Sequence, residues 1–418
     1  MKNKLGNVLN YIVPLAKSEG FKETFRMTEK DFTRNRKLSF FDYISIIMQC
    51  SKSSLQSTLN MYLQAKREKS LEYSKQAFSK GRHRIKAEAF KYLMEETAKK
   101  FYDDGDFKTF RDYVLLSIDG SDYNLPYSPE LLNAFGSESF SNGVQVQALT
   151  STLFDVLNGI VLEAEIKPFN ANERELAITH LKRFRNKSDK EAIVMMDRGY
   201  PSFDLIYNCE ILNLKYLMRC NKDTFLKEIR KADKSDETVV ITRNGKEVTV
   251  RVVTVQVNDT PFTFITNLTD EIYTKEDFAQ LYYRRWNIEI LYNKLKNTLE
   301  IENFSGLDEL CVKQDFYASM ILLNLSACSI FESQKVINKQ RNSEKIYKAN
   351  HTFAVSELKM RLIKMLYTDS SLVRLKESNY IKKALTKNTI LFRPDRTCER
   401  KCFHPCLKNS PNHKRTSL

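Results

Sequence analysis

The stretch EAIVMMDRGYPSFDLIYNCEILNLKYLMRC, residues 191–220, decides the fold class of this chain. Its apolar residues 192–196 predict a buried strand, and that strand stops at the acid Asp197. Pro201 then opens a short segment with helical spacing, and KYLMRC (215–220) predicts a second apolar strand. Strand, helix and strand in this order are typical of an α/β domain.

Three further strands and a helix are expected upstream of that stretch. YVLLSIDG (113–120) predicts a buried strand, and residues 144–156 and 159–169 predict two more, joined by the turn LNG. Residues 173–185 then have helical spacing. Three strands, a helix, a strand, a helix and a strand is the order of the ribonuclease-H-like fold, and many α/β domains come close to it.

Downstream, the chain departs from that plan. Alternating apolar residues between 223 and 270, with Asn244-Gly245 as a type I′ turn, predict a β-strand insertion. Helical periodicity returns over residues 276–300, so the insertion precedes the last helix of the core. The apolar segment 317–331 is shorter than the roughly 20 residues that span a bilayer, and it predicts a buried helix.

The first part of the chain is rich in helix formers. Apolar residues recur at three and four positions in 40–50 and 87–102, which predicts helices. Residues 66–86 hold eight Lys or Arg and two acids. Two interpretations of this basic segment stay open: a helical module that contacts DNA, and a solvated pair of basic helices.

The composition indicates a globular protein with a polyanionic partner. The 418 residues carry a formal net charge of +15, which favours nucleic acid, although some enzymes are merely basic. Scattered cysteines suit reduced, buried thiols. The C-terminal tail is basic, and we expect it to contact phosphate. Zinc binding is the weaker interpretation of the cysteines and histidines in this tail, which are Cys398, Cys402, Cys406, His404 and His413.

Two acids end predicted strands. Asp119 closes the strand at 113–120, and Asp197 closes the strand at 192–196. A carboxylate at the end of a buried strand sits on a rigid support facing a crevice, and two in one sheet make a shared metal site plausible. Asp122 is a weaker rival of Asp119, because we expect it in a turn beyond the strand.

A third acid lies in YYRRWNIEILYNKLK, residues 282–296. On an α-helix Tyr282, Arg285, Glu289 and Lys296 fall within a stripe about 60° wide, at roughly 0°, 300°, 340° and 320°. The leucines and isoleucines of the segment gather on a different face. The acid is therefore flanked by a phenol and two cations, and Trp286 is expected to support packing.

This set of residues suits phosphodiester chemistry. Two divalent ions about 3.5–4 Å apart activate an attacking oxygen and stabilise the leaving oxygen of an in-line displacement. Mg²⁺ prefers a few carboxylate ligands and keeps several waters, and Asp119, Asp197 and Glu289 would supply those carboxylates. Arginine and lysine hold neighbouring phosphates as a fork and as a point charge.

The spacing Y-x2-R-x3-E-x6-K resembles the signature of bacterial DDE transposases of the insertion sequence four family. DGSDYNLP at the first acid, DRGY at the second and RRWNIE at the third are also similar to that family, as is DFTRNRKLSFFDYI. The resemblance covers roughly residues 30–335. It implies a ribonuclease-H-like core, a DDE triad using two Mg²⁺ or Mn²⁺ ions, and cut-and-paste movement in a bacterial cytoplasm.

Carried over residue by residue, the resemblance implies metal ligands at Asp119, Asp197 and Glu289. It implies DNA contacts at Tyr282, Arg285 and Lys296, to which we add the adjacent Arg284 and Arg198. Terminal inverted repeats and target DNA are the expected partners, with a homodimer pairing two ends and no membrane. The expected domains are a helical DNA-binding region, a core interrupted by the β insertion, and a basic C-terminal region: 1–108, 109–222, 223–270, 271–335 and 336–418.

Two alternatives to a transposase stay open. One is another ribonuclease-H-like nuclease, such as a resolvase, that only hydrolyses DNA. The other is a domesticated DNA-binding protein that has no catalytic activity.

Overall fold

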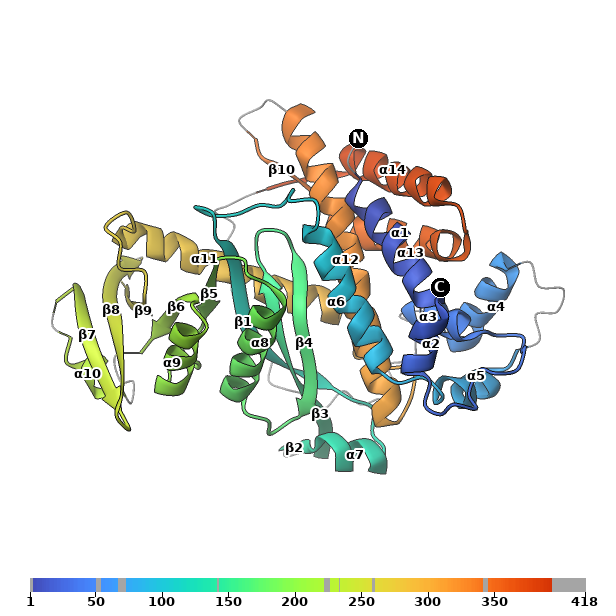
Figure 1. The fold of residues 1–418 in the computed structure, drawn as a ribbon, viewed down its shortest axis with the longest axis horizontal. Helices are drawn as coiled ribbons and strands as arrows, with labels where there is room; N and C mark the ends of the chain where they lie inside the picture. The colour runs from blue at the N-terminus through green and yellow to red at the C-terminus, as the bar shows by residue number, and fades with distance from the viewer. Residues whose placement is uncertain are drawn as a thin grey trace. The chain divides into compact units, whose positions relative to one another are not determined.

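A computed structural model describes residues 3–49, 54–66, 73–140, 143–221, 226–232, 234–257, 260–340 and 345–392. The cysteines and histidines of the predicted tail cluster lie outside these residues. The chain divides into two compact units, which alternate along the sequence. Figure 1 shows the helices and strands, coloured from the N-terminus to the C-terminus. Unit 1 comprises Met1–Asp106, Tyr123–Ala148 and Lys294–Leu418, and unit 2 comprises Phe107–Asp122 and Leu149–Asn293.

Unit 2 is built on a mixed sheet with strand order β3-β1-β5-β6-β9-β8-β7, in which β4 also pairs with β3. The strands β1, β5 and β6 run parallel, and β6, β9, β8 and β7 pair antiparallel. The strand bounds are β1 Val114–Asn124, β3 Gly143–Asp155, β4 Ile160–Pro168, β5 Ala192–Met196, β6 Lys215–Cys220, β7 Asp236–Arg243, β8 Lys246–Val257 and β9 Thr260–Thr266. The predicted mixed α/β class is confirmed.

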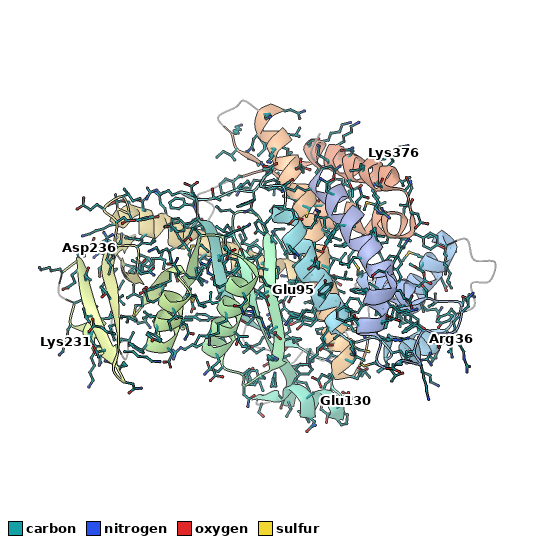
Figure 2. All side chains as sticks on the ribbon, viewed as in Figure 1. Arg36, Glu95, Glu130, Lys231, Asp236 and Lys376 are labelled. Carbon is teal, nitrogen blue, oxygen red and sulfur yellow. The ribbon has the colours of Figure 1, made fainter. Side chains whose placement is uncertain are left out.

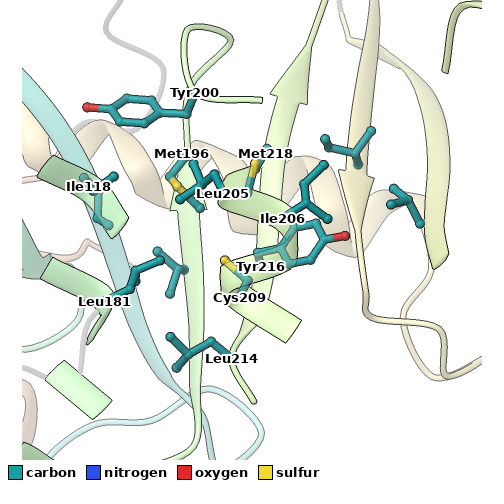
Figure 3. Close-up of a cluster of buried hydrophobic side chains, with 14 of the residues drawn as sticks. Ile118, Leu181, Met196, Tyr200, Leu205, Ile206, Cys209, Leu214, Tyr216 and Met218 are labelled. Atoms are coloured by element: carbon teal, nitrogen blue, oxygen red, sulfur yellow. The ribbon is translucent and has the colours of Figure 1, made fainter. Parts of the chain in front are cut away.

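Helices cover both faces of this sheet. Helices α8 (Glu173–Lys187) and α9 (Phe203–Ile211) pack on one face, and α11 (Lys275–Asn293) packs against β5, β6 and β8. Side chains alternate along β5, so Val194 and Met196 join the apolar cluster under α8 and α9 (Figure 3), while Met195 points to the other face. Each fully buried aliphatic side chain contributes about 1.5–3 kcal/mol.

The strands between β6 and α11 follow the expected pattern. Residues Asn244 and Gly245 have φ angles of 51° and 73°, which a type I′ turn requires, and they join β7 to β8 as predicted. Asp236 of β7 (labelled in Figure 2) forms an ion pair with Arg251 of β8, with 2.8 Å between Oδ2 and Nη2. The short helix α10 (Lys227–Arg230) precedes β7.

Unit 1 is mainly helical. Its long helix α12 (Glu309–Gln340) packs against α1, α3, α6, α13 and α14. The remaining elements are α1 Lys4–Lys17, α2 Glu19–Phe25, α3 Phe40–Gln49, α4 Leu55–Ala65, α5 Lys75–Arg82, α6 Glu88–Tyr102, α7 Pro129–Phe135, the π-helix η1 Lys294–Thr298, α13 His351–Tyr367, α14 Ser371–Lys387, and strands β2 Ser137–Phe140, β10 Tyr347–Ala349 and β11 Thr389–Leu391.

Helix α12 contains the apolar segment 317–331, which is a buried helix as predicted. The helix is 32 residues long, so it extends well beyond the apolar segment. By length and composition it could cross a bilayer, but 89% of its apolar window is buried inside the protein. Burial of this kind is typical of a core helix.

Three local expectations need correction. Strand β1 continues to Asn124, so Asp122 lies within the strand and not in a turn; Thr150 donates to the carbonyl of Ser121 there, over 2.8 Å. The last helix of unit 2 does not stay α-helical to residue 300, because η1 begins at Lys294. Arg82 of the basic segment is 1% exposed and forms an ion pair with Asp315. This side chain is therefore part of the core, and neither of the two interpretations of the basic segment describes it.

Candidate active site

The register of two parallel strands brings Asp119 and Asp197 together. Residue Val114 lies opposite Ala192, and Ser117 lies opposite Met195. The same offset of 78 residues, continued by two positions, sets Asp119 level with Asp197. Asp197 therefore directly follows β5, at the edge where α/β sheets place their functional groups. Asp119 was expected to close its strand but lies inside β1, just beyond the part of β1 that pairs with β5.

Helix α11 brings Glu289 to this edge through Arg285. The guanidinium of Arg285 donates from Nη2 to Oε1 of Glu289 over 2.9 Å, and its Nη1 lies 3.5 Å from Oδ2 of Asp119. Arg285 is 5% exposed, whereas the side chain of Glu289 is 32% exposed and that of Asp119 is 19% exposed. The guanidinium thus connects two of the predicted acids, Asp119 and Glu289, and Asp197 lies near Asp119. The carboxylate oxygens of the three acids do not all lie within 4.8 Å of one another.

The electrostatics of Asp119 reflect this crowding. Burial raises the pKa of Asp119 to about 7; Arg285 opposes the shift, and the neighbouring carboxylate of Asp197 adds to it. A raised carboxyl pKa in a polar crevice is typical of a functional site.

Sequence reasoning missed a fourth acid, Glu173. It is the first residue of α8, and its Oε2 accepts a hydrogen bond from the hydroxyl of Tyr200 over 2.9 Å. A Cβ placed at Gly120 would lie 2.2 Å from that same Oε2, so glycine next to Asp119 leaves room for the carboxylate. Burial raises the pKa of Glu173, and Asp197 adds to the shift.

Tyr292 is a second residue that the pattern did not single out. Its hydroxyl donates to the backbone carbonyl of Asp119 over 2.5 Å and lies 2.9 Å from Oγ1 of Thr152. The hydroxyl thereby links the last turn of α11 to β1 at Asp119. The sequence offered one signal for a role of Tyr292 at the site, which is its position three residues after Glu289 on the same helix.

The predicted DNA contacts differ in their surroundings. Tyr282 is 6% exposed, and its ring packs 5.1 Å from that of Phe264, between centroids. Arg284 and Arg198 are exposed. Lys296 belongs to unit 1, where its Nζ lies 5.1 Å from the ring centroid of Tyr123. None of these surroundings tests DNA contact, which stays a prediction for all five positions, Arg285 included.

Trp286 does not match its expected role of packing support. Its side chain is 42% exposed, and the guanidinium carbon of Arg285 lies 5.7 Å from its ring centroid. The tryptophan therefore presents much of its surface to solvent, beside the residue that links Asp119 and Glu289. By contrast, His180 is fully buried against Ser151, which agrees with a core role.

The donor set fits a hard divalent cation. Asp119, Asp197 and Glu289 offer carboxylate oxygens, which Mg²⁺ and Mn²⁺ prefer. Asp197 contributes to the raised pKa of Asp119, after burial, and a cation at this pair would favour the charged form of both carboxyls. Arg285 bonds to Oε1 of Glu289, and a carboxylate that accepts one hydrogen bond still has lone pairs for a cation.

Comparisons with known proteins show the family of this chain. The family model described as transposase DDE domain matches residues 111–325, slightly more than half of the chain. Transposase InsG for insertion sequence element IS4, from Escherichia coli (strain K12), is 24% identical over 267 residues. That match covers 60% of this chain and 59% of the relative, so the chain spans less than two thirds of the relative's length.

A solved structure is also similar: the cryo-EM structure of a piggyBac transposase synaptic complex with hairpin DNA. Its TM-score is 0.43 with 11% sequence identity, over 90% of this chain and 80% of that chain. The matched family model includes Asp119, Asp197 and Glu289 in its range. The resemblance to DDE transposases is confirmed, and the chain belongs to the transposase DDE domain family.

Proposed function

We propose that this protein is a transposase that excises an insertion sequence and joins it to new DNA. The observation that carries the proposal is the β1–β5 register, which sets Asp119 level with Asp197 and within reach of the helix that bears Glu289. Membership of the transposase DDE domain family supports it. The parallel strands β1, β5 and β6 would be part of a ribonuclease-H-like core, interrupted by β7–β9.

The proposed reaction has two displacements at phosphorus. A water oxygen attacks the phosphodiester at the element end, its proton leaves to solvent, and the bond to the 3′-oxygen breaks. The freed 3′-hydroxyl then attacks a target phosphodiester, loses its proton, and displaces the 3′-oxygen of the target strand. Two Mg²⁺ or Mn²⁺ ions would supply Lewis-acid chemistry when bound.

In this proposal the carboxylates of Asp119, Asp197 and Glu289 hold the ions. Arg285 orients Glu289 through the 2.9 Å hydrogen bond and limits repulsion between the acids. Tyr292 fixes the carbonyl of Asp119, which keeps this part of β1 in place. The exposed Arg284 and Arg198, together with Tyr282 and Lys296, would contact the DNA backbone.

The expected substrate is double-stranded DNA with terminal inverted repeats, and a homodimer would hold two ends. The net charge of +15 supports a polyanionic partner. We infer that the protein acts on DNA in the bacterial cytoplasm.

The test is an incubation of the full-length protein and Mg²⁺ with DNA that carries the terminal repeats flanking its gene, plus a target plasmid. Strand-transfer products support the proposal. Cleavage without joining would instead indicate a nuclease, and binding without cleavage would indicate a DNA-binding protein that lacks catalysis. Either of the last two results contradicts the proposed function.

A further inference from the structure

Away from the acids of unit 2, three different metal-ligating side chains meet in unit 1. Ligand atoms of His83, Asp308 and Cys311 all lie within 4.8 Å of one another, and among the described residues no other such group of three forms. His83 caps the C-terminus of α5, and Asp308 and Cys311 stand at the start of α12. Segments more than 200 residues apart therefore converge on one point.

The imidazole of His83 is held in the orientation of a metal ligand. Its Nδ1 lies 2.6 Å from the backbone carbonyl of Ser79, and a carbonyl only accepts, so Nδ1 carries the proton. Its Nε2 faces Oδ2 of Asp308 over 3.2 Å. Histidines that bind metals commonly donate from the other ring nitrogen to a carbonyl in this way. A cation between Nε2 and the carboxylate would satisfy both atoms.

Asp308 and Cys311 complete the set from one helical turn. The backbone N–H of Cys311 donates to Oδ1 of Asp308 over 2.8 Å, which caps α12 and leaves Oδ2 directed at His83. Cys311 is 2% exposed, so its sulfur lies at the inner side of the cluster. A Cβ at Gly306 would come within 2.6 Å of that sulfur, and only glycine gives the thiol this position.

We propose that His83, Asp308 and Cys311 bind a Zn²⁺ ion, with water as the fourth ligand. Nitrogen, oxygen and sulfur donors together suit zinc, which is borderline soft and prefers four ligands. The side chain of His83 is 46% exposed, which leaves the fourth position open to solvent. On binding, the thiol of Cys311 gives its proton to solvent and coordinates as a thiolate.

The site would fasten the basic segment to the long helix of unit 1. Arg82, next to His83, already pairs with Asp315 over 2.8 Å and donates to Gln314. Zinc at the adjacent position would add a second link between the end of α5 and the first turn of α12. This role does not depend on the proposed DNA chemistry, because no residue of the unit 2 site takes part.

The experiment is metal titration of full-length protein freed of metal with a chelator. The cysteines at 398, 402 and 406 are replaced by serine in every sample, so that the tail cannot contribute thiolates. We expect one equivalent of Zn²⁺ by competition with a chromogenic chelator. With Co²⁺ as probe, we expect one thiolate charge-transfer band and the visible bands of a tetrahedral ion.

Variants assign the ligands. His83→Ala and Cys311→Ser should each lose that equivalent, and Cys311→Ser should also lose the charge-transfer band. Asp308→Asn keeps an N-cap acceptor for α12, so it should fold and bind zinc at least about tenfold more weakly. Cys328→Ser, a buried thiol of the same helix, is the matched control and should bind as the parent does.

The proposal is overturned if the parent binds no zinc equivalent. It is also overturned if Cys311→Ser and His83→Ala bind as tightly as the Cys328→Ser control. Either result would leave His83, Asp308 and Cys311 as a hydrogen-bonded helix cap only.

Discussion

At the scale of single residues, Arg285 shows what spacing can and cannot predict. The interval to Glu289 placed both residues on one side of a helix, and they do form a hydrogen bond. The same pattern also predicted that Arg285 contacts a DNA phosphate. In the structure its side chain is 5% exposed, and its guanidinium also faces Asp119. Burial depends on packing between distant segments, which a local pattern does not contain.

Asp119 leads to a prediction about pH. Its pKa in the folded protein, about 7, exceeds the ordinary value of an aspartate, so the folded state holds the proton more tightly. Its contribution to stability is therefore complete below the ordinary pKa of aspartate and is lost as pH rises through about 7. At about 1.4 kcal/mol per pH unit, we expect a loss of about 3 kcal/mol between pH 5 and pH 8.

Asp119→Asn should remove that dependence. In metal-free protein, the free energy of unfolding of the variant relative to the parent should increase from pH 5 to pH 8, as measured by urea denaturation. Asp204→Asn, which changes an exposed aspartate on α9, provides the control. Parallel pH profiles of parent and Asp119→Asn would contradict the raised pKa.

At the scale of elements, apolar runs were predictable and their neighbours were not. Runs that stop at acids located Asp119 and Asp197, because strand periodicity is a local property. Only β5 ends at its acid, whereas pairing with distant segments extends β1 to Asn124. Glu173 begins a helix whose first turn is acidic, which is ordinary for a helix N-terminus and gave no sign of a role. Only the close approach of the Glu173 side chain to Gly120 of β1 reveals it.

Gly120 tests that packing. Gly120→Ala would place a Cβ 2.2 Å from Oε2 of Glu173, so the carboxylate must move and lose its hydrogen bond from Tyr200. We expect a loss of about 0.5–1.5 kcal/mol in the free energy of unfolding. Glu173→Ala in the same chain should relieve the clash, so that the double variant loses less than the sum of the two single variants. A double-mutant cycle by urea denaturation measures the coupling. Strict additivity would show that the two residues do not touch.

The end of α11 shows a different limit. A stripe through Tyr282, Arg285, Glu289 and Lys296 assumed 100° per residue, but the chain changes to a π-helix at Lys294. Lys296 therefore leaves the line that the first three residues follow. A change of helix type is set by packing around the turn, and the helical periodicity of residues 276–300 gave no warning of it.

At the scale of the whole molecule, composition predicted more about the partner than about the architecture. Helices α13 and α14 lie in the C-terminal region, for which only a basic character was predicted. Helix α7 and strand β2, which follow β1 and precede β3 along the chain, were not predicted. The five domain limits given by the sequence analysis remain a prediction. The two compact units of the structure interleave along the chain. Contacts between distant segments decide such a division, whereas net charge is a sum over residues.

The charge leads to a prediction about salt. If the protein binds DNA through phosphate contacts, the logarithm of its affinity should fall linearly with the logarithm of salt concentration, with a slope of about −0.9 for each phosphate neutralised. Arg284→Ala should reduce the slope by about one. Fluorescence anisotropy with labelled end DNA measures both. An affinity that does not change with salt would contradict a backbone-contacting interface.

The most direct test of the account is strand cleavage at the element end by Glu289→Gln and by its matched control Glu276→Gln. Both substitutions lie on α11, and Glu276 is exposed in its first turn. We expect Glu289→Gln to bind end DNA as the parent does and to lose cleavage with Mg²⁺ or Mn²⁺, while Glu276→Gln cleaves normally. Cleavage by Glu289→Gln at the parental rate would contradict the assignment of Asp119, Asp197 and Glu289 as the catalytic triad.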